Sequence, residues 1–370
     1  MADVFRFADD LGPLKVIHVH NPAIGLKAVL VVDNVATGPS IGGLRMAPDV
    51  STEECFRLAR AMTLKNAAAG LQHGGGKSVL FGDPKMGKAE KERLIRGFAC
   101  ALKDEHDYIF GPDMGTDEEC MAWVHDEIGR AVGLPAACGG IPLDEIGATG
   151  WGLSHVVEAA VRHCDFELEG ATLAIQGFGA VGKHAARFLA KKGVVLVGAS
   201  DSRGTVHNPD GIDVDELIAL KAEGRSVVDY PKGEKLDREQ VIDISCDIWI
   251  PAARPDVVHL ENAHRLKTKL VVQGANIPFT YDAEKYLHQQ GILCIPDFIA
   301  NAGGVICAAM EYHGACQSAA FETIAEKIRA NTEQILRKVT CKKTLPRDKA
   351  MRFAGQRVRE AMDTRRWSIL

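Results

Sequence analysis

A glycine-rich segment in the middle of the chain constrains the fold more than any other feature. Gly177-Phe-Gly-Ala-Val-Gly182 follows the apolar run Thr172–Gln176 and opens a stretch with helical periodicity. The next apolar run, Val194–Val197, ends shortly before Asp201, which lies 19 residues after Gly182. This order of strand, glycine turn, helix, strand and acidic residue is the fingerprint of a dinucleotide-binding βαβ unit. A glycine-rich turn in an unrelated α/β fold accounts less well for the flanking strands.

The three glycines have distinct expected roles in holding a dinucleotide. Gly177 makes the tight turn, Gly179 lets the backbone approach the pyrophosphate, and Gly182 allows the helix to pack closely on the strand. The N-terminus of the helix then attracts the negative pyrophosphate. The segment therefore predicts a nucleotide cofactor.

The residues after the second strand bear on which cofactor is used. Asp201 is placed to accept hydrogen bonds from the adenosine ribose, which favours NAD. Ser202 and Arg203 follow directly, and either can meet a 2′-phosphate. NADP, or use of both cofactors, therefore stays open.

Periodicity elsewhere predicts further strands and helices. Apolar runs that fit strands of the same parallel sheet are Cys246–Ile250, Leu270–Val272 and Gly291–Ile295. Helical patterns span Ser51–Gly70, Thr149–His163, Gly304–Val339 and Arg347–Arg366. The first of these begins with Ser51-Thr-Glu-Glu54, which is typical of a capping box, and ends at a glycine suited to the C′ position.

The length of 370 residues favours two domains. A Gly/Pro/Ala-rich segment around Pro135–Pro142 predicts a hinge between them. We therefore expect an α/β fold with an N-terminal α/β catalytic domain, residues 1–140, and a Rossmann-type dinucleotide-binding domain, residues 145–330. A cleft separates the two domains, and C-terminal helices of about 335–370 complete the first.

Charge and cysteine usage exclude several classes of function. A net charge of −5 gives no basic field for nucleic acid. No apolar stretch approaches the roughly 20 residues that span a bilayer, and the first ten residues lack the basic and apolar regions of a signal peptide. None of the ten cysteines forms a Cys-x-x-Cys pair, so we expect no metal site. These features predict a cytoplasmic protein.

Two lysines and an aspartate in the first half are candidates for chemistry. Lys65 follows Met62 by three residues on an apolar helical stripe, where a buried cation needs an anionic partner. The alternative is a surface lysine with a buried stem. Lys77 follows three glycines, and the spacing differs from that of a phosphate-binding loop because Leu71 occupies a required glycine position. Asp113 follows Gly-Pro, where an aspartate is usually a turn former.

These residues belong to a set of motifs that resembles the glutamate/leucine/phenylalanine/valine dehydrogenase family. The resemblance covers nearly the whole chain, and its motifs occur in family order. They are Gly38-Pro-Ser-Ile-Gly-Gly-Leu-Arg45, Met62-Thr-Leu-Lys-Asn-Ala-Ala-Ala-Gly70, Gly74-Gly-Gly-Lys77, Gly111-Pro-Asp-Met-Gly-Thr116, Ala148-Thr-Gly-Trp-Gly152, the Gly177–Gly182 fingerprint, Gly274-Ala-Asn276 and Asn301-Ala-Gly-Gly-Val305.

The resemblance implies a role for each matching residue. Lys65 resembles the lysine that pairs with the substrate α-carboxylate, Lys77 the one that activates the attacking water, and Asp113 the aspartate that moves protons to and from the amine. The implied cofactor contacts are Thr149, Gly177, Phe178, Gly179, Ala180, Val181, Gly182, Asp201, Ser202, Arg203, Ala252, Asn276 and Asn301. The implied substrate contacts are Lys65, Ile41, Gly43, Gly111, Asn301, Val305 and Ala308.

The side-chain pocket implied by the motifs distinguishes branches of the family. Members that use glutamate place a lysine before the Gly-Gly of the first motif, and this chain has Ile41 there. A glutamate side chain would be buried without its cation. Gly111 and Ala308 are small and leave volume. We therefore expect an apolar substrate, branched-chain or aromatic, which matches the leucine/phenylalanine-type branch.

Two other functions remain as alternatives. One is a glutamate dehydrogenase in which another cation replaces the missing lysine; the stretch after Asn301 resembles glutamate-type sequences. The other is a non-catalytic relative that binds nucleotide, which the intact trio of Lys65, Lys77 and Asp113 disfavours. The resemblance also implies a closed homo-oligomer.

Overall fold

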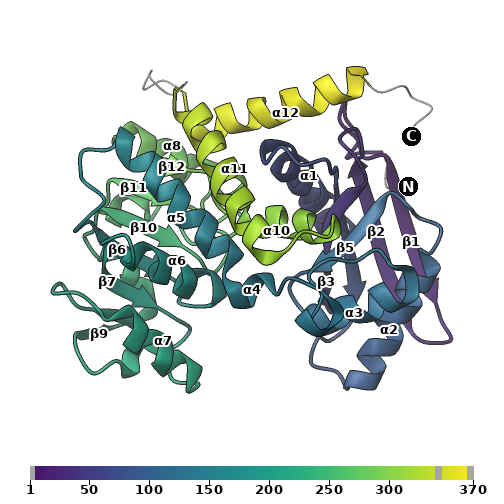
Figure 1. The fold of residues 1–370 in the computed structure, drawn as a ribbon, viewed down its shortest axis with the longest axis horizontal. Helices are drawn as coiled ribbons and strands as arrows, with labels where there is room; N and C mark the ends of the chain where they lie inside the picture. The colour runs from purple at the N-terminus through teal and green to yellow at the C-terminus, as the bar shows by residue number, and fades with distance from the viewer. Residues whose placement is uncertain (1–4, 338–343, 365–370) are drawn as a thin grey trace. The chain divides into compact units, whose positions relative to one another are not determined.

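The computed structural model describes residues 5–337 and 344–364 and divides the chain into two compact units. Unit 1 comprises Met1–Leu143, Val305–Ala320 and Arg352–Leu370, and unit 2 comprises Asp144–Gly304 and Phe321–Met351. Each unit is built on its own β-sheet with helices packed against it (Figure 1). The expectation of a two-domain α/β fold is confirmed.

The sheet of unit 1 has five strands in the order β1-β2-β4-β3-β5. Strand β2 pairs antiparallel with β1 and β4, whereas β3 runs parallel to both β4 and β5. The strands are β1 (Lys15–Asn21), β2 (Leu26–Asn34), β3 (Ser40–Ala47), β4 (Gly75–Phe81) and β5 (Tyr108–Pro112).

Helices cover both faces of this sheet. On one face, α1 (Thr52–Ala68) packs Phe56 and Ala59 against Val31 and Val79. On the other, α2 (Lys88–Ala101) and α3 (Glu118–Ile128) pack against residues such as Leu44. As expected, the side chain of Ser51 caps α1 by accepting a hydrogen bond from the Glu54 amide, 3.1 Å away. Gly70 follows the helix with φ +63°, which suits a C′ glycine.

The sheet of unit 2 has seven strands in the order β12-β11-β10-β6-β7-β8-β9. The first five are parallel, and β8 and β9 extend the edge in antiparallel pairs. Their bounds are β6 (Thr172–Gln176), β7 (Val195–Ser200), β8 (Thr205–His207), β9 (Glu234–Leu236), β10 (Ile248–Pro251), β11 (Leu270–Val272) and β12 (Leu293–Ile295). The predicted parallel sheet is present, and sequence reading missed the three-residue strands β8 and β9.

The helices around this sheet include both helices of the fingerprint region. Helix α6 (Ala180–Ala190) follows β6, and α5 (Ala148–Ala160) precedes it, close to the predicted helix over residues 149–163. The shorter helices are α4 (Leu143–Ile146), α7 (Val214–Ala222), α8 (Tyr281–Gln289) and α9 (Asp297–Ala300). Short stretches of 3-10 helix span Ala136–Cys138, Val161–His163, Val227–Asp229, Arg238–Asp243 and Ala263–Arg265.

The C-terminal helices differ from the prediction. A single helix over residues 304–339 is wrong, because the chain forms α10 (Gly303–Tyr312) and α11 (Gln317–Arg337). Gly314 separates them with φ +74°, a left-handed conformation that ends a helix. Val339 lies outside the described residues. The predicted tail helix is α12 (Pro346–Thr364), and Arg366 lies beyond the described range.

Candidate functional site

The Gly74–Gly76 run brings helix α1 onto strand β4. A Cβ on Gly75 would lie 2.0 Å from the Thr63 amide nitrogen, and one on Gly74 would lie 1.8 Å from the Asn34 carbonyl oxygen. Side chains at these positions are therefore incompatible with the observed packing. Gly75 thus allows close contact between α1 and β4, and Gly74 allows close contact with the end of β2. The contact at Gly75 holds α1, which carries Lys65, directly over the strand that carries Lys77.

Strands β3, β4 and β5 present the predicted pocket residues on one face. Register pairs Ile41 with Gly75 and Ile109, and Gly43 with Gly111. Alternate residues of a strand share a face, so Ile41 and Gly43 lie on the face that α1 covers. A Cβ on Gly43 would lie 3.0 Å from the Lys77 Nζ. The absence of a side chain at Gly43 therefore makes room for the side chains of Lys77 and Asp113.

Lys77 and Asp113 form an ion pair on this face. The Lys77 Nζ donates to the Asp113 Oδ2 over 2.5 Å, and the lysine side chain is 6% exposed. Burial alone would raise the pKa of Asp113, but Lys77 and Arg45 outweigh it and hold that pKa well below its ordinary value. Asp113 is therefore ionised near neutral pH.

Arg45 is a site residue that sequence reasoning missed. Its Nε donates to the same Oδ2 of Asp113 over 3.0 Å, and its Nη1 donates to the Glu54 Oε1 over 2.5 Å. Strand alternation was the signal that could have found it, because Arg45 follows Gly43 by two residues and must share its face. A charged side chain on a covered strand face requires a partner.

The turn after β5 fixes the position of Asp113. The Asp113 amide donates to the Thr116 Oγ1 over 3.0 Å, and that hydroxyl donates to the Leu44 carbonyl over 2.7 Å. Gly115 adopts φ +84°, and its Cβ would lie 2.1 Å from the Met46 carbonyl oxygen. The turn is therefore tied to β3 along its whole length.

Four further substrate candidates, Lys65, Gly111, Val305 and Ala308, also belong to unit 1. Lys65 is buried on α1 at 8% exposure. Val305 and Ala308 lie on α10, and Ala308 is buried. A Cβ on Gly111 would meet Val132 at 3.5 Å, an ordinary contact distance, so the position has room for a methyl group.

The fingerprint of unit 2 has the geometry that a dinucleotide requires. Gly177 turns with φ +97°, and a Cβ on Gly182 would lie 2.1 Å from the Gly177 carbonyl oxygen. A Cβ on Gly179 would meet no heavy atom within 4 Å, and no side chain caps α6 at this residue. The N-terminus of α6 is thus open to a ligand where the pyrophosphate is expected, and the residues present fit the cofactor.

Asp201 follows β7 as expected, but its carboxylate is already occupied. The Oδ1 accepts from the Ser226 hydroxyl over 2.8 Å and the Arg203 amide over 2.9 Å. The Oδ2 accepts from the Lys221 Nζ over 2.7 Å and the Val227 amide over 3.0 Å. Burial raises the pKa of Asp201, but these donors hold it at about 2. A ribose hydroxyl would have to share an oxygen with them.

Some of the other cofactor candidates of unit 2 are joined by hydrogen bonds. Asn301 donates from its Nδ2 to the Asn276 Oδ1 over 3.0 Å. The Ala252 amide donates to the Gln176 carbonyl over 2.7 Å, next to the fingerprint. Thr149 lies in the first turn of α5. Phe178 is buried, and Ala180 and Val181 begin α6. Ser202 and Arg203 are exposed, and Arg203 lies 3.5 Å from Asp229.

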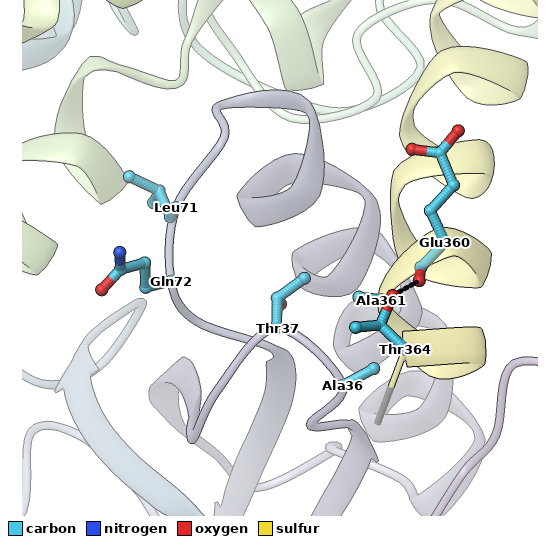
Figure 2. Close-up of a pocket in the computed structure, with 7 residues that line it drawn as sticks. All are labelled: Ala36, Thr37, Leu71, Gln72, Glu360, Ala361 and Thr364. Carbon is cyan, nitrogen blue, oxygen red and sulfur yellow. Dashed lines mark hydrogen bonds between the residues drawn. The ribbon is translucent and has the colours of Figure 1, made fainter. Parts of the chain in front are cut away.

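A hollow of about 410 Å³ lies elsewhere in unit 1. Figure 2 shows Glu360 and Thr364 of α12 on one side and Leu71 and Gln72 on the other. None of the residues predicted for catalysis lines it. Among the described residues no group of three or more His, Cys, Asp or Glu side chains is arranged to hold a metal ion, and no described helix is long and apolar enough to cross a membrane.

Two family models match most of the chain. Residues 13–130 match the Glu/Leu/Phe/Val dehydrogenase dimerisation domain, and residues 139–366 match Glutamate/Leucine/Phenylalanine/Valine dehydrogenase. Individual proteins are similar over comparable lengths. The chain is 36% identical to the glutamate dehydrogenase of Aeropyrum pernix over 358 residues, which is 90% of this chain and 85% of that protein.

Two further proteins extend the comparison. The NADP-specific glutamate dehydrogenase of Saccharolobus shibatae is 38% identical over 295 residues, 75% of this chain and 69% of that protein. The crystal structure of a hetero-hexameric glutamate dehydrogenase from Thermus thermophilus, in its Leu-bound form, superposes with a TM-score of 0.86 at 29% identity. It covers 96% of this chain and 90% of that one.

Proposed function

The chain belongs to the Glutamate/Leucine/Phenylalanine/Valine dehydrogenase family, and we propose that its substrate is an apolar L-amino acid, branched-chain or aromatic. The enzyme is an NAD(P)-dependent amino-acid dehydrogenase. In the proposed reaction it converts the amino acid to the 2-oxo acid and ammonia, and the reaction is reversible.

The cations around Ile41 carry the argument for an apolar substrate. In β3, β4 and β5 the only cationic residues are Arg45 and Lys77. Both are paired with carboxylates of the protein itself. A substrate side-chain carboxylate beside Ile41, which is 3% exposed, would therefore find no cation on these strands.

The residues of unit 1 supply binding and proton transfer in this proposal. Lys65 pairs with the α-carboxylate and so orients the Cα–H bond. Asp113, kept ionised by its two cations, accepts a proton from the substrate amine and returns one as ammonia leaves. Lys77 activates the water that adds to the imine carbon of the substrate.

The residues of unit 2 hold the cofactor, which supplies the hydride acceptor when it is bound. The backbone at Gly177–Gly182 and the N-terminus of α6 bind the pyrophosphate. Asn276 and Asn301 bind the nicotinamide half. The exposed Arg203 side chain pairs with Asp229, whereas the Asp201 carboxylate accepts from the Lys221 ammonium group and from the Arg203 amide. The adenosine ribose site therefore combines an acceptor with a cation bound to it. We propose that it accepts both NAD and NADP.

Glutamate is the second candidate substrate. The relatives that the chain matches at 36% and 38% identity are named glutamate dehydrogenases. For this chain to use glutamate, a cation from outside β3–β5 must reach the substrate side chain. The two candidates therefore differ in the charge of the group beside Ile41.

A panel of 2-oxo acids with ammonia tests the proposal. The oxidation of NADH and NADPH is followed with 2-oxoglutarate, 4-methyl-2-oxopentanoate, 3-methyl-2-oxobutanoate, phenylpyruvate and indolepyruvate. We expect kcat/KM to be highest for one of the apolar acids. A preference for 2-oxoglutarate would contradict the Ile41 argument, and Ile41→Lys is expected to increase activity with that acid.

We also propose that the enzyme is a homo-oligomer. The residues that match the dimerisation domain cover most of unit 1, which supports self-association, and the Thermus relative is described as hetero-hexameric. Light scattering of the purified chain measures the assembly. The cytoplasmic location expected from the sequence stays a prediction.

A further inference from the structure

The loop Gly274–Ile277, which follows β11, contains a strained residue. Ile277 adopts φ +48°, in the left-handed region that a β-branched side chain rarely occupies. Such a conformation costs on the order of 1–3 kcal/mol and persists only where surrounding contacts enforce it. Its position directly after Asn276 places the strain beside the proposed nicotinamide contact.

Two hydrogen bonds hold the backbone of Ile277. Its amide donates to the Asp297 Oδ2 over 2.8 Å. Its carbonyl accepts from the amide of Asp256 over 2.9 Å, and Asp256 itself has φ +51°. The side chain of Asp297, a residue that is 5% exposed, thus holds the strained peptide through its amide.

Helix α9 holds the loop from both of its ends. Asp297 begins the helix and binds Ile277, whereas Asn301 follows its last residue. The Asn301 Nδ2 donates to the carbonyl oxygens of Gly274 and Ala275, each over 3.3 Å, as well as to Asn276. The loop conformation therefore depends on where α9 lies.

Arg347, at the start of α12, fixes Asp297 in turn. Its Nη2 donates to the Asp297 Oδ1 over 2.9 Å, and its Nε donates to the Glu284 Oε2 over 2.5 Å. The Gln273 Oε1 accepts from the same Nη2 over 3.0 Å. Glu284 and Gln273 are 2% and 0% exposed. Arg347 therefore joins three buried polar groups and leaves the other oxygen of Asp297 to the loop.

We propose that Arg347 and Asp297 are positioning residues for the cofactor, which keep the Gly274–Ile277 loop in the strained conformation that presents Asn276 to the nicotinamide half. This inference rests on the proposed function for the identity of the ligand. In this proposal Arg347 acts through Asp297 and not by direct contact with the cofactor or the substrate. If Arg347 only held the start of α12 in place, its substitution would not change the backbone conformation of Ile277.

The test compares cofactor affinity in Arg347→Met with that in Arg359→Met. Arg359 lies on the same helix but pairs with Asp10, an exposed partner. Binding of NADH and NADPH is measured by fluorescence titration, together with KM for the 2-oxo acid. In Arg347→Met the Kd of the tighter cofactor rises roughly tenfold, the equivalent of one net hydrogen bond, and KM for the 2-oxo acid changes less than about twofold. Arg359→Met changes neither quantity.

The decisive comparison uses a variant in which the backbone strain at residue 277 is relieved. Ile277→Gly removes the penalty of the left-handed conformation, so the loop no longer needs enforcement. In the double variant Arg347→Met/Ile277→Gly the Kd returns to within about threefold of Ile277→Gly alone. If Arg347→Met does not fold, Asp297→Asn tests the same link, since it keeps the shape and weakens both hydrogen bonds.

Two results would overturn the inference. One is an unchanged cofactor Kd in Arg347→Met with only a lower melting temperature, which would show that the arginine merely docks α12. The other is a double variant as weak as Arg347→Met. A wild-type chain that binds NADH but converts none of the 2-oxo acids would instead overturn the proposed function, and the binding comparison would still decide the role of Arg347.

Discussion

Two glycine-rich segments of this chain have opposite relations to their surroundings. In Gly74–Gly76 an added Cβ would collide with protein atoms at each position, with nearest distances of 1.8, 2.0 and 2.8 Å. In the fingerprint, a Cβ on Gly179 would meet nothing within 4 Å, although one on Gly182 would collide with the Gly177 carbonyl. Protein atoms therefore fill the space around every glycine of the first segment. In the second segment they fill the space around Gly182 but leave the space at Gly179, at the N-terminus of α6, free.

This contrast shows that glycine has two different uses in this chain. Gly74–Gly76 allows close packing within unit 1 around the start of β4, the strand that carries Lys77. Gly179 keeps space clear for a ligand at the positive end of a helix. The first segment should therefore govern stability and, through Lys77, chemistry, whereas Gly179 in the second should govern cofactor affinity alone.

The largest expected effect is on turnover. Lys77→Ala and Asp113→Asn each remove one member of the ion pair, and we expect kcat to fall by about 10³-fold or more, since proton transfer in both directions is lost. Fluorescence titration should give cofactor affinities near the wild-type values, because these residues belong to unit 1. Turnover near the wild-type level in either variant would contradict the assigned roles.

The next effect is on stability. Gly75→Ala places a methyl group 2.0 Å from the Thr63 amide, so α1 must shift away from β4. We expect a loss of about 3 kcal/mol in the free energy of unfolding, measured by urea denaturation, together with reduced turnover. A Gly75→Ala protein of wild-type stability would show that α1 can shift away from β4 without loss of folding free energy. That result would contradict the claim that the Gly74–Gly76 segment is closed by tight packing.

Gly179→Ala is the matched substitution in the open segment. The residue has φ −92° and ψ −157°, which alanine adopts readily, and the added methyl group meets no protein atom. We expect the free energy of unfolding to change by less than about 0.5 kcal/mol and the cofactor Kd to rise roughly tenfold. A stable variant with unchanged affinity would mean that the pyrophosphate does not approach this helix end.

Sequence patterns predicted the elements whose ends are marked by special residues. Strands β6 and β11 match the predicted runs residue for residue, and α1 begins and ends at its serine cap and C′ glycine. The helix over residues 304–339 failed because apolar periodicity continues across Gly314, while the backbone there is left-handed. Periodicity reports which side chains are buried, but it does not report the φ angle of one residue.

Sequence patterns were also unable to predict which side chains of the candidate site contact one another. Resemblance singled out Lys77 and Asp113, yet their 2.5 Å contact depends on the parallel register of β4, β3 and β5, which no local pattern encodes. Arg45 was missed because it stands in a Gly/Pro-rich motif whose strand character appears only when β4 and β5 flank it. The internal donors to Asp201 come from residues 203–227 and were equally hidden.

The smallest effect concerns the electrostatics of the closed segment. Arg45→Met removes one of the two cations on the Asp113 Oδ2, so burial is less fully opposed and the pKa of Asp113 rises. Because the carboxylate must be ionised to accept a proton, we expect the acidic limb of the pH profile of kcat/KM for deamination to move to higher pH. The lowered pKa also stabilises the fold above the unfolded-state pKa, and this contribution is lost as pH falls through the folded-state value.

Arg60→Met provides the control for that experiment, since it removes another arginine that binds two carboxylates in unit 1. Arg60 pairs with Asp33 and Asp9, whereas Lys77 pairs with Asp113. Both variants should lose stability, but only Arg45→Met should move the acidic limb. Equal pH profiles for the two variants would assign Arg45 to packing alone and leave Lys77 as the cation that sets the charge of Asp113.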